Sequence, residues 1–101
     1  MNWLWTWGGN SFGYRAAGEL WTHDGHHAGR FHAREVYGPD GLYLGEVMNE
    51  DRLIVDRTKK SQRVTEFSRL PESVGHPAGF GFNRVALPDG YEDFPRPARF
   101  R

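Results

Sequence analysis

A repeat with a period of 16 residues runs through the first two thirds of the chain and limits what the chain can fold into. Glycine, acidic and apolar residues keep this interval. The clearest sets are Gly9, Gly25 and Gly41; Gly13, Gly29 and Gly45; Asp24, Asp40 and Asp56; Leu4, Leu20 and Val36. Because a unit of this length cannot bury a hydrophobic face alone, the copies must pack together around one core.

Each repeat has the pattern of a β-hairpin. Asp24-Gly25 and the Gly-Pro-Asp-Gly run at 38–41 are turn signals, since proline presets one backbone angle and glycine accepts a positive φ. The segments 20–23, 28–31 and 42–47 around them are rich in aromatic and β-branched residues. We therefore predict an all-β domain of four hairpins in a pseudo-four-fold closed arrangement.

The second glycine of each repeat falls inside the outgoing strand. Glycine in a strand marks a bulge or the close approach of another backbone. The recurrence of Gly13, Gly29 and Gly45 predicts strands that crowd a common axis.

The fourth repeat, residues 52–67, departs from the pattern. Arg57 stands where the turn glycine is expected, and Ser61 stands where the strand glycine is expected. The first repeat is also incomplete, since it begins near Trp3. We expect residues 64–67 to pair beside residues 3–7, which closes the ring and leaves no sheet edge open.

The composition changes after residue 70. Five of the six prolines fall in the last 31 residues, which also hold Phe80, Phe82, Tyr91, Phe94 and Phe100. We predict a hairpin domain at residues 1–70 and an extended, proline-rich tail at residues 71–101. The tail has too many aromatic residues for a solvated linker, so it is expected to pack along the ring.

Trp3, Trp5 and Trp7 alternate along the first strand, so they share one of its faces, and Leu4 lies on the other. One face belongs to the core, and the other needs a cover because exposed aromatic surface is costly. The cover is either Phe80 and Phe82 of the tail or a ligand that stacks on aromatic rings, such as a sugar or a peptide. We favour the tail.

Charge and composition limit the partners. Thirteen basic and 13 acidic residues cancel, so no long-range field attracts nucleic acid or an anionic membrane. The one basic run, residues 57–63, lacks interleaved aromatic residues and fits a polar hairpin tip. No stretch has the roughly 18 consecutive apolar residues of a spanning helix. We expect a soluble cytoplasmic protein, monomeric or weakly homo-oligomeric.

The repeat frame resembles a known family. The runs GGNSFGYRAAGELWTHDGHHAGRF, VYGPDGLYLGEV and DRLIV are similar to the bacterial 4-fold β-flower domain, over residues 3–70. The resemblance implies four hairpins around a pseudo-four-fold axis. It implies no activity and no site residues, so function has to be argued from the residues themselves.

The first functional hypothesis is a non-catalytic binding or interaction module. Trp5, Trp21 and Tyr37 occupy one position of the repeat and, together with the hairpin tips, would present a surface to a protein or a small ligand. A third class, a structural accessory, would show no such surface. No cofactor is expected.

The alternative is a metal-binding protein or a metal-dependent enzyme. His23, His26 and His27 lie close together and are typical metal ligands. Around one hairpin turn, however, side chains diverge, so the binding module is favoured.

The recurring carboxylates Glu19, Glu35 and Asp51 allow two interpretations. A ring of like charge could bind a cation or raise a carboxylate pKa for acid–base work. We favour ion pairs with the neighbouring arginines Arg15, Arg34 or Arg52, or hydrogen bonds to turn amides.

Overall fold

The sequence repeat appears in the structure as three equivalent turns. In the computed structural model, which describes residues 1–81 and 85–101, the turn glycines Gly9, Gly25 and Gly41 have φ of 91°, 91° and 82°. Each donates its N–H to the carbonyl three residues earlier, at 2.9–3.1 Å. The turns join three strand pairs: β1 (Asn2–Thr6) to β2 (Ser11–Ala16), β3 (Glu19–Thr22) to β4 (His27–His32), and β5 (Glu35–Tyr37) to β6 (Tyr43–Met48).

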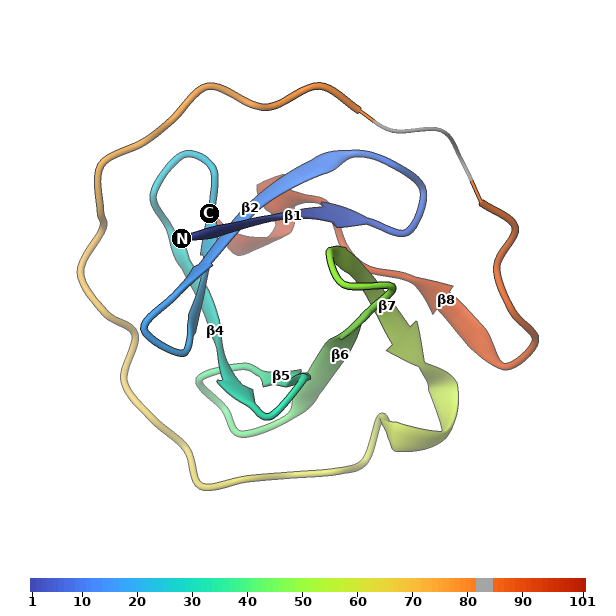
Figure 1. Cartoon of the computed structure of the whole chain (residues 1–101). Helices are drawn as coiled ribbons and strands as arrows, with labels where there is room; N and C mark the ends of the chain where they lie inside the picture. Colours follow the sequence, from blue (N-terminus) through green and yellow to red (C-terminus); the bar gives the residue numbers. More distant parts are fainter. Residues whose placement is uncertain (82–84) are drawn as a thin grey trace.

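The strands form one sheet that closes on itself (Figure 1). Strands β1 to β7 (Arg52–Asp56) follow each other as antiparallel neighbours. The ring closes because β1 also pairs with β7 in parallel, with Trp5 opposite Arg52 and Thr6 opposite Leu53. The predicted all-β, closed arrangement of hairpins is therefore confirmed.

The closing strand differs from the predicted one. Residues 64–67 do not lie beside residues 3–7. After β7 the chain turns away in the short 3-10 helix η1 (Arg57–Lys59), whose first turn is capped by the side chain of Asp56. It then passes the third hairpin tip, where the N–H of Val64 bonds to the carbonyl of Gly41 at 2.8 Å. The apolar run of β7 closes the ring instead.

The tail supplies the second strand that the fourth repeat lacks. Residues 57–70 contribute a single bridge, between Leu42 and Arg63, and no strand. Strand β8 (Tyr91–Asp93) pairs instead with residues 54–56 of β7, on the side where the second strand of a fourth hairpin is expected.

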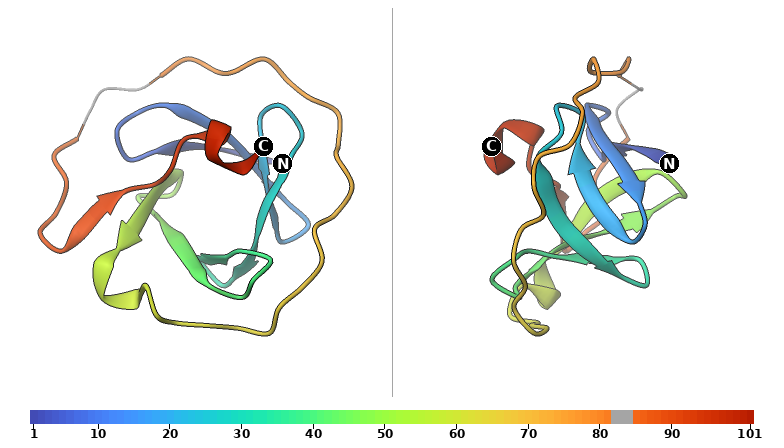
Figure 2. Two further views of the ribbon diagram at one scale, coloured as in Figure 1. Left: turned by 180° about the vertical axis from the view of Figure 1, so that it is seen from behind. Right: turned by 90° about the vertical axis from the view of Figure 1, so that its left-hand side faces the viewer.

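The described part of the chain between these points, up to residue 81, lies on the outside of the ring. Residues 68–81, yellow to orange in Figure 1, run around the closed sheet. The chain ends in η2 (Pro97–Phe100), which lies at one end of the ring, whereas the N-terminus lies toward the other (Figure 2). Neither 3-10 helix, nor any other helix in the described part of the chain, is long and apolar enough to cross a membrane.

The core lies inside the ring. Leu20, Val36 and Leu53 are fully buried there. At one end, the ring of Phe12 meets those of Phe94 and Phe100, with centroids 5.2 and 5.5 Å away. The last residues of the tail therefore belong to the same core as the hairpins.

The in-strand glycines allow successive hairpins to cross at close range. A Cβ atom at Gly29 would lie 2.7 Å from the carbonyl oxygen of Tyr37, and one at Gly45 would lie 2.6 Å from that of Ile54. A Cβ atom at Gly13 would overlap the carbonyl oxygen of Trp21. The predicted close backbone approach is confirmed at all three positions.

We expect Gly13→Ala to destabilise the fold by about 2 kcal/mol, because the added methyl group meets rigid backbone rather than a movable side chain. The measurement is urea unfolding followed by circular dichroism. The matched control is Gly38→Ala, since a Cβ atom there has the flexible Asp40 carboxylate as its nearest neighbour, at 3.1 Å. Equal midpoints for the two variants would contradict the crowding argument.

Candidate functional site

Trp3 and Trp5 on the outer face of β1, and the buried Trp7 just after the strand, meet the tail. The ring of Trp3 lies edge-on to that of His76, at 5.5 Å between centroids. The indole Nε1–H of Trp5 donates to the carbonyl of Phe80 at 2.7 Å, and that of Trp7 donates to the carbonyl of Ala86 at 3.1 Å. The tail therefore contacts this face through His76 and through the carbonyls of Phe80 and Ala86.

The cover is not made by the residues expected. The side chain of Phe80 is 95% exposed, so this residue contributes its carbonyl group and not a buried ring. Phe82 lies outside the described residues. Cover comes instead from His76 and from main-chain carbonyls, because an extended chain can accept hydrogen bonds from indoles without burying its own side chains.

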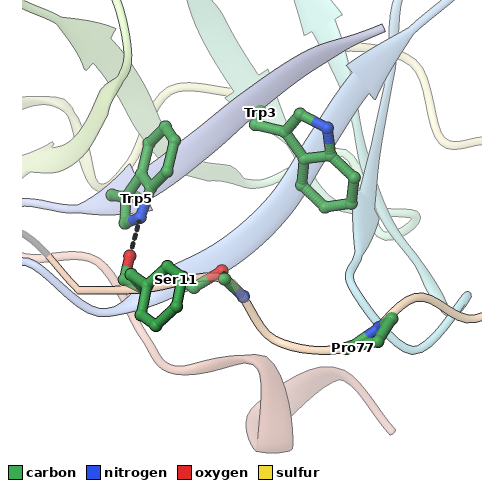
Figure 3. A pocket seen from close by; sticks show the side chains of 6 residues that line it. Trp3, Trp5, Ser11 and Pro77 are labelled. Carbon is green, nitrogen blue, oxygen red and sulfur yellow. Dashed lines mark hydrogen bonds between the residues drawn. The ribbon is translucent and has the colours of Figure 1, made fainter.

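A pocket of about 410 Å³ remains between the tryptophans and the tail. It is lined by Trp3, Trp5, Ser11, Pro77, Gly79 and Phe80, and we refer to it as the tryptophan pocket. Figure 3 shows the two indoles projecting side by side from β1, with Pro77 on the facing tail. The N–H of Gly79 donates to Ser11 Oγ at 3.0 Å, which ties this wall to β2.

The lining of the tryptophan pocket suits binding and not catalysis. Its walls are aromatic rings, a proline ring and open backbone, and none of the six residues carries a charge. Ser11 is the one hydroxyl among them, and no carboxylate, imidazole or amine is present in the lining to activate it.

The three predicted ligand residues lie on different strands. Trp5 lines the tryptophan pocket together with Trp3, not with its repeat equivalents. Trp21, on β3, is half-buried, with its ring centroid 5.2 Å from that of His27. Tyr37, on β5, is 4% exposed. Equivalent positions in the repeat thus have different surroundings.

Tyr37 is held inside the protein by hydrogen bonds. Its hydroxyl donates to Glu35 Oε1 at 2.9 Å and accepts from Gln62 Nε2 at 3.1 Å. Burial, followed by the bond to Glu35, raises the pKa of this hydroxyl. The ring of Tyr37 therefore belongs to the core, and its hydroxyl is hydrogen-bonded at the edge of the core.

The predicted metal ligands face three different partners. His23 Nδ1 lies 3.0 Å from the carbonyl oxygen of His76, and His26 Nδ1 lies 3.3 Å from Glu72 Oε1. Within residues 1–81 and 85–101, no three histidine or carboxylate side chains gather in a way that could hold a metal ion.

His27, the third of these residues, is buried and uses both ring nitrogens. Its Nδ1 accepts the N–H of Leu70 at 3.0 Å, so Nε2 carries the proton and donates to Glu19 Oε1 at 2.7 Å. The tail also bonds to this hairpin tip through its main chain, from Ser73 N–H to the carbonyl of Gly25 at 2.8 Å. The histidine-rich tip is therefore where the tail is fastened to the ring.

Ion pairing is the role of the recurring carboxylates Glu19 and Glu35, although with other partners than expected. Glu19 bonds to His27 and to Arg30, whose Nε lies 2.9 Å from Oε2. Glu35 pairs with Lys59 at 2.8 Å. Arg15 instead lies over the ring of Phe31, 4.1 Å from its centroid.

Lys59 bridges two carboxylates beside the core. Its Nζ donates to Glu35 Oε2 at 2.8 Å and to Glu46 Oε1 at 2.9 Å, and Glu46, which is 1% exposed, also accepts the hydroxyl of Tyr43 at 2.8 Å. The bonds to Glu35 and then to Glu46 raise the pKa of Lys59, and the bond from Lys59 lowers the pKa of Glu35. Lys59 and Glu35 therefore stay ionised at neutral pH and attract each other.

No protein-family model, no curated protein and no solved structure matches this chain. Membership of the 4-fold β-flower family stays a prediction from the quoted motifs.

We expect Lys59→Met to destabilise the protein by about 3 kcal/mol at pH 7, because it leaves the buried Glu46 carboxylate without its ammonium partner. The lowered pKa of Glu35 means that its pairing stabilises the fold above the ordinary value of 4.5 and is lost as the pH falls through the lowered one. The gap between wild type and variant, measured by urea unfolding, should therefore shrink below pH 4.5.

The control for this prediction is Lys60→Met, which removes a pair with Glu92 whose two side chains are 55% and 40% exposed. Such a surface pair contributes about 1 kcal/mol or less. A gap for Lys59→Met that is no larger than for Lys60→Met, or that does not depend on pH, would refute a stabilising role of the bridge.

Proposed function

We propose that this chain is a non-catalytic binding module whose ligand site is the tryptophan pocket. The observation that carries the proposal is the side chain of Phe80, which is 95% exposed at a wall that it shares with Trp3 and Trp5. Apolar surface left in water costs free energy in proportion to its area, and a ligand that covers it recovers that cost.

The size and lining of the pocket support this role and indicate the kind of ligand. A volume of about 410 Å³ is in the range that holds a small molecule or one or two side chains. Because the lining carries no charge, an ionised group would lose its hydration there without gaining a partner. The ligand therefore presents an uncharged, apolar face.

The pocket walls are already fixed, which lowers the entropy cost of binding. Trp5 is held by its bond to the carbonyl of Phe80, and Trp3 packs edge-on against Tyr14, at 5.3 Å between centroids, and against His76. The Gly79–Ser11 bond fixes the opposite wall.

We also propose the family and the class of partners that the sequence predicts. Three equivalent glycine turns at one spacing support membership of the 4-fold β-flower family. A net charge of zero supports a protein or small neutral ligand as partner in place of nucleic acid.

We expect at least one uncharged ring compound to bind the full-length protein with a dissociation constant of millimolar or below, as for a small apolar ligand in a preformed site. Saturation-transfer NMR with p-cresol, cyclohexanol and methyl glucoside is the measurement. Phe80→Ala should weaken binding about fivefold through lost apolar contact. It should not unfold the protein, because the Phe80 side chain is exposed.

Val74→Ala is the matched control, since Val74 is an exposed apolar residue of the same tail that does not line the pocket. It should bind as the wild type does. The proposal fails if no probe shows transfer, or if both variants change binding equally.

A further inference from the structure

The tail is fastened to the second hairpin beside a buried histidine. The N–H of Leu70 donates to His27 Nδ1 at 3.0 Å, and the ring centroid of Phe67 lies 5.8 Å from that of His27. His27 itself is 2% exposed. We refer to residues 67–70 as the fastening segment, because both of its ends contact this side chain.

The two ring nitrogens of His27 face different parts of the protein. Nε2 donates to Glu19 Oε1 at 2.7 Å, and Glu19 also accepts from Arg30 Nε at 2.9 Å. Both charged residues belong to the ring, Glu19 to β3 and Arg30 to β4. Nδ1 has its partner in the tail, which meets the imidazole with the N–H of Leu70, whereas Arg69, the charged residue of the fastening segment, is exposed.

A proton on Nδ1 of His27 is incompatible with the bond to the tail. A charged imidazole carries an N–H at both nitrogens and has no acceptor left. Its Nδ1–H would face the N–H of Leu70, and two donors that meet at a buried site without a partner cost free energy. The bond from Nε2 to Glu19 would be kept, and it would become stronger because its donor is charged.

Only interactions that differ between the fastened and the released tail can shift the equilibrium between these two states. Glu19 lies on the ring, so it attracts a charged His27 in both states. The N–H of Leu70 at Nδ1, and the exclusion of water there, belong to the fastened state alone. Both oppose protonation, so the fastened state takes up the proton less readily and is lost as the pH falls.

The other two histidines of this hairpin tip respond differently to a proton. His23 Nδ1 faces the carbonyl oxygen of His76, to which a charged imidazole still donates. His26 Nδ1 lies 3.3 Å from Glu72 Oε1, so a proton on His26 strengthens that contact with the tail. The Glu72 side chain is 76% exposed, and such a surface pair changes an equilibrium constant by a factor of about five at most. Losing the buried hydrogen bond of His27 changes it about tenfold, so His27 sets the direction.

We propose that His27 is a proton-sensitive switch: when it is protonated, the fastening segment detaches from the second hairpin while the ring stays folded. Histidine suits this role because it is the side chain whose charge ordinarily changes between about pH 5 and 8. The switch concerns the attachment of the tail and does not depend on a ligand in the tryptophan pocket.

The test is amide hydrogen exchange of the full-length protein, measured by NMR and expressed as protection factors, which removes the direct effect of pH on exchange. Between about pH 8 and about pH 5 the protection of the Leu70 N–H should fall about tenfold, as for the loss of one hydrogen bond. The N–H of Phe31, which bonds to the carbonyl of Gly18 within the ring, should change by less than about twofold. The imidazole signals should show that the fall at Leu70 follows the protonation of His27.

Two variants separate the possible sensors. Leu70→Pro removes the donor and leaves His27 in place, and the ring should stay folded because Leu70 is 38% exposed. His27 should then bind its proton about tenfold more tightly than in the wild type, since coupling between two events is reciprocal. Glu72→Gln is the matched control, because it removes the ion pair of His26 with the same tail. It should leave the pH dependence at Leu70 unchanged.

Three results would overturn the switch. The first is a protection factor of Leu70 that does not change with pH, and the second is a change that disappears in Glu72→Gln, which would make His26 the sensor. The third is a joint loss of protection at Leu70 and Phe31, because acid would then unfold the ring itself. None of these results bears on the proposed function, which is tested by ligand binding alone.

Discussion

The close passage of each hairpin over the glycine of its neighbour is the contact on which the rest of the structure depends. At Gly13, Gly29 and Gly45 there is no room for a side chain between one strand and the carbonyl groups of the next. This closeness keeps the ring narrow enough for residues such as Leu20 and Val36 to fill it. With so few core residues available, a wider ring would leave cavities, which cost stability.

Local features of the fold were predictable, and its closure was not. The turns at Gly9, Gly25 and Gly41 follow from signals a few residues long. The partner of β1, in contrast, depends on which of two segments distant in sequence competes better for its edge. Residues 53–55 of β7 are buried, whereas residues 64–67 are half-buried or exposed and bond to a hairpin tip. The apolar run at 53–55 is a local signal for a buried strand, but the strand with which it pairs depends on the whole fold.

The candidate site shows the same division. Alternation along the first strand correctly placed Trp3 and Trp5 on one outer face, but it gave no signal for Ser11, Pro77 or Gly79, which reach the pocket through the path of the tail. Because Tyr37 and Trp5 occupy the same position of the repeat, the sequence suggested that they have similar surroundings. Their surroundings differ, because Gln62, from the degenerate repeat, bonds to the hydroxyl of Tyr37.

One edge of β7 pairs with two different strands, β1 and β8, and this affects how the chain folds during its synthesis. Residues 52–53 of β7 are paired with β1, but residues 54–56 wait for β8, which is synthesised after residues 57–90. During translation at about 5–20 residues per second, an apolar edge therefore stays unpaired for seconds. A nascent chain in that state is open to pairing with another chain, so the last strand acts as a protection against aggregation as well as a part of the fold.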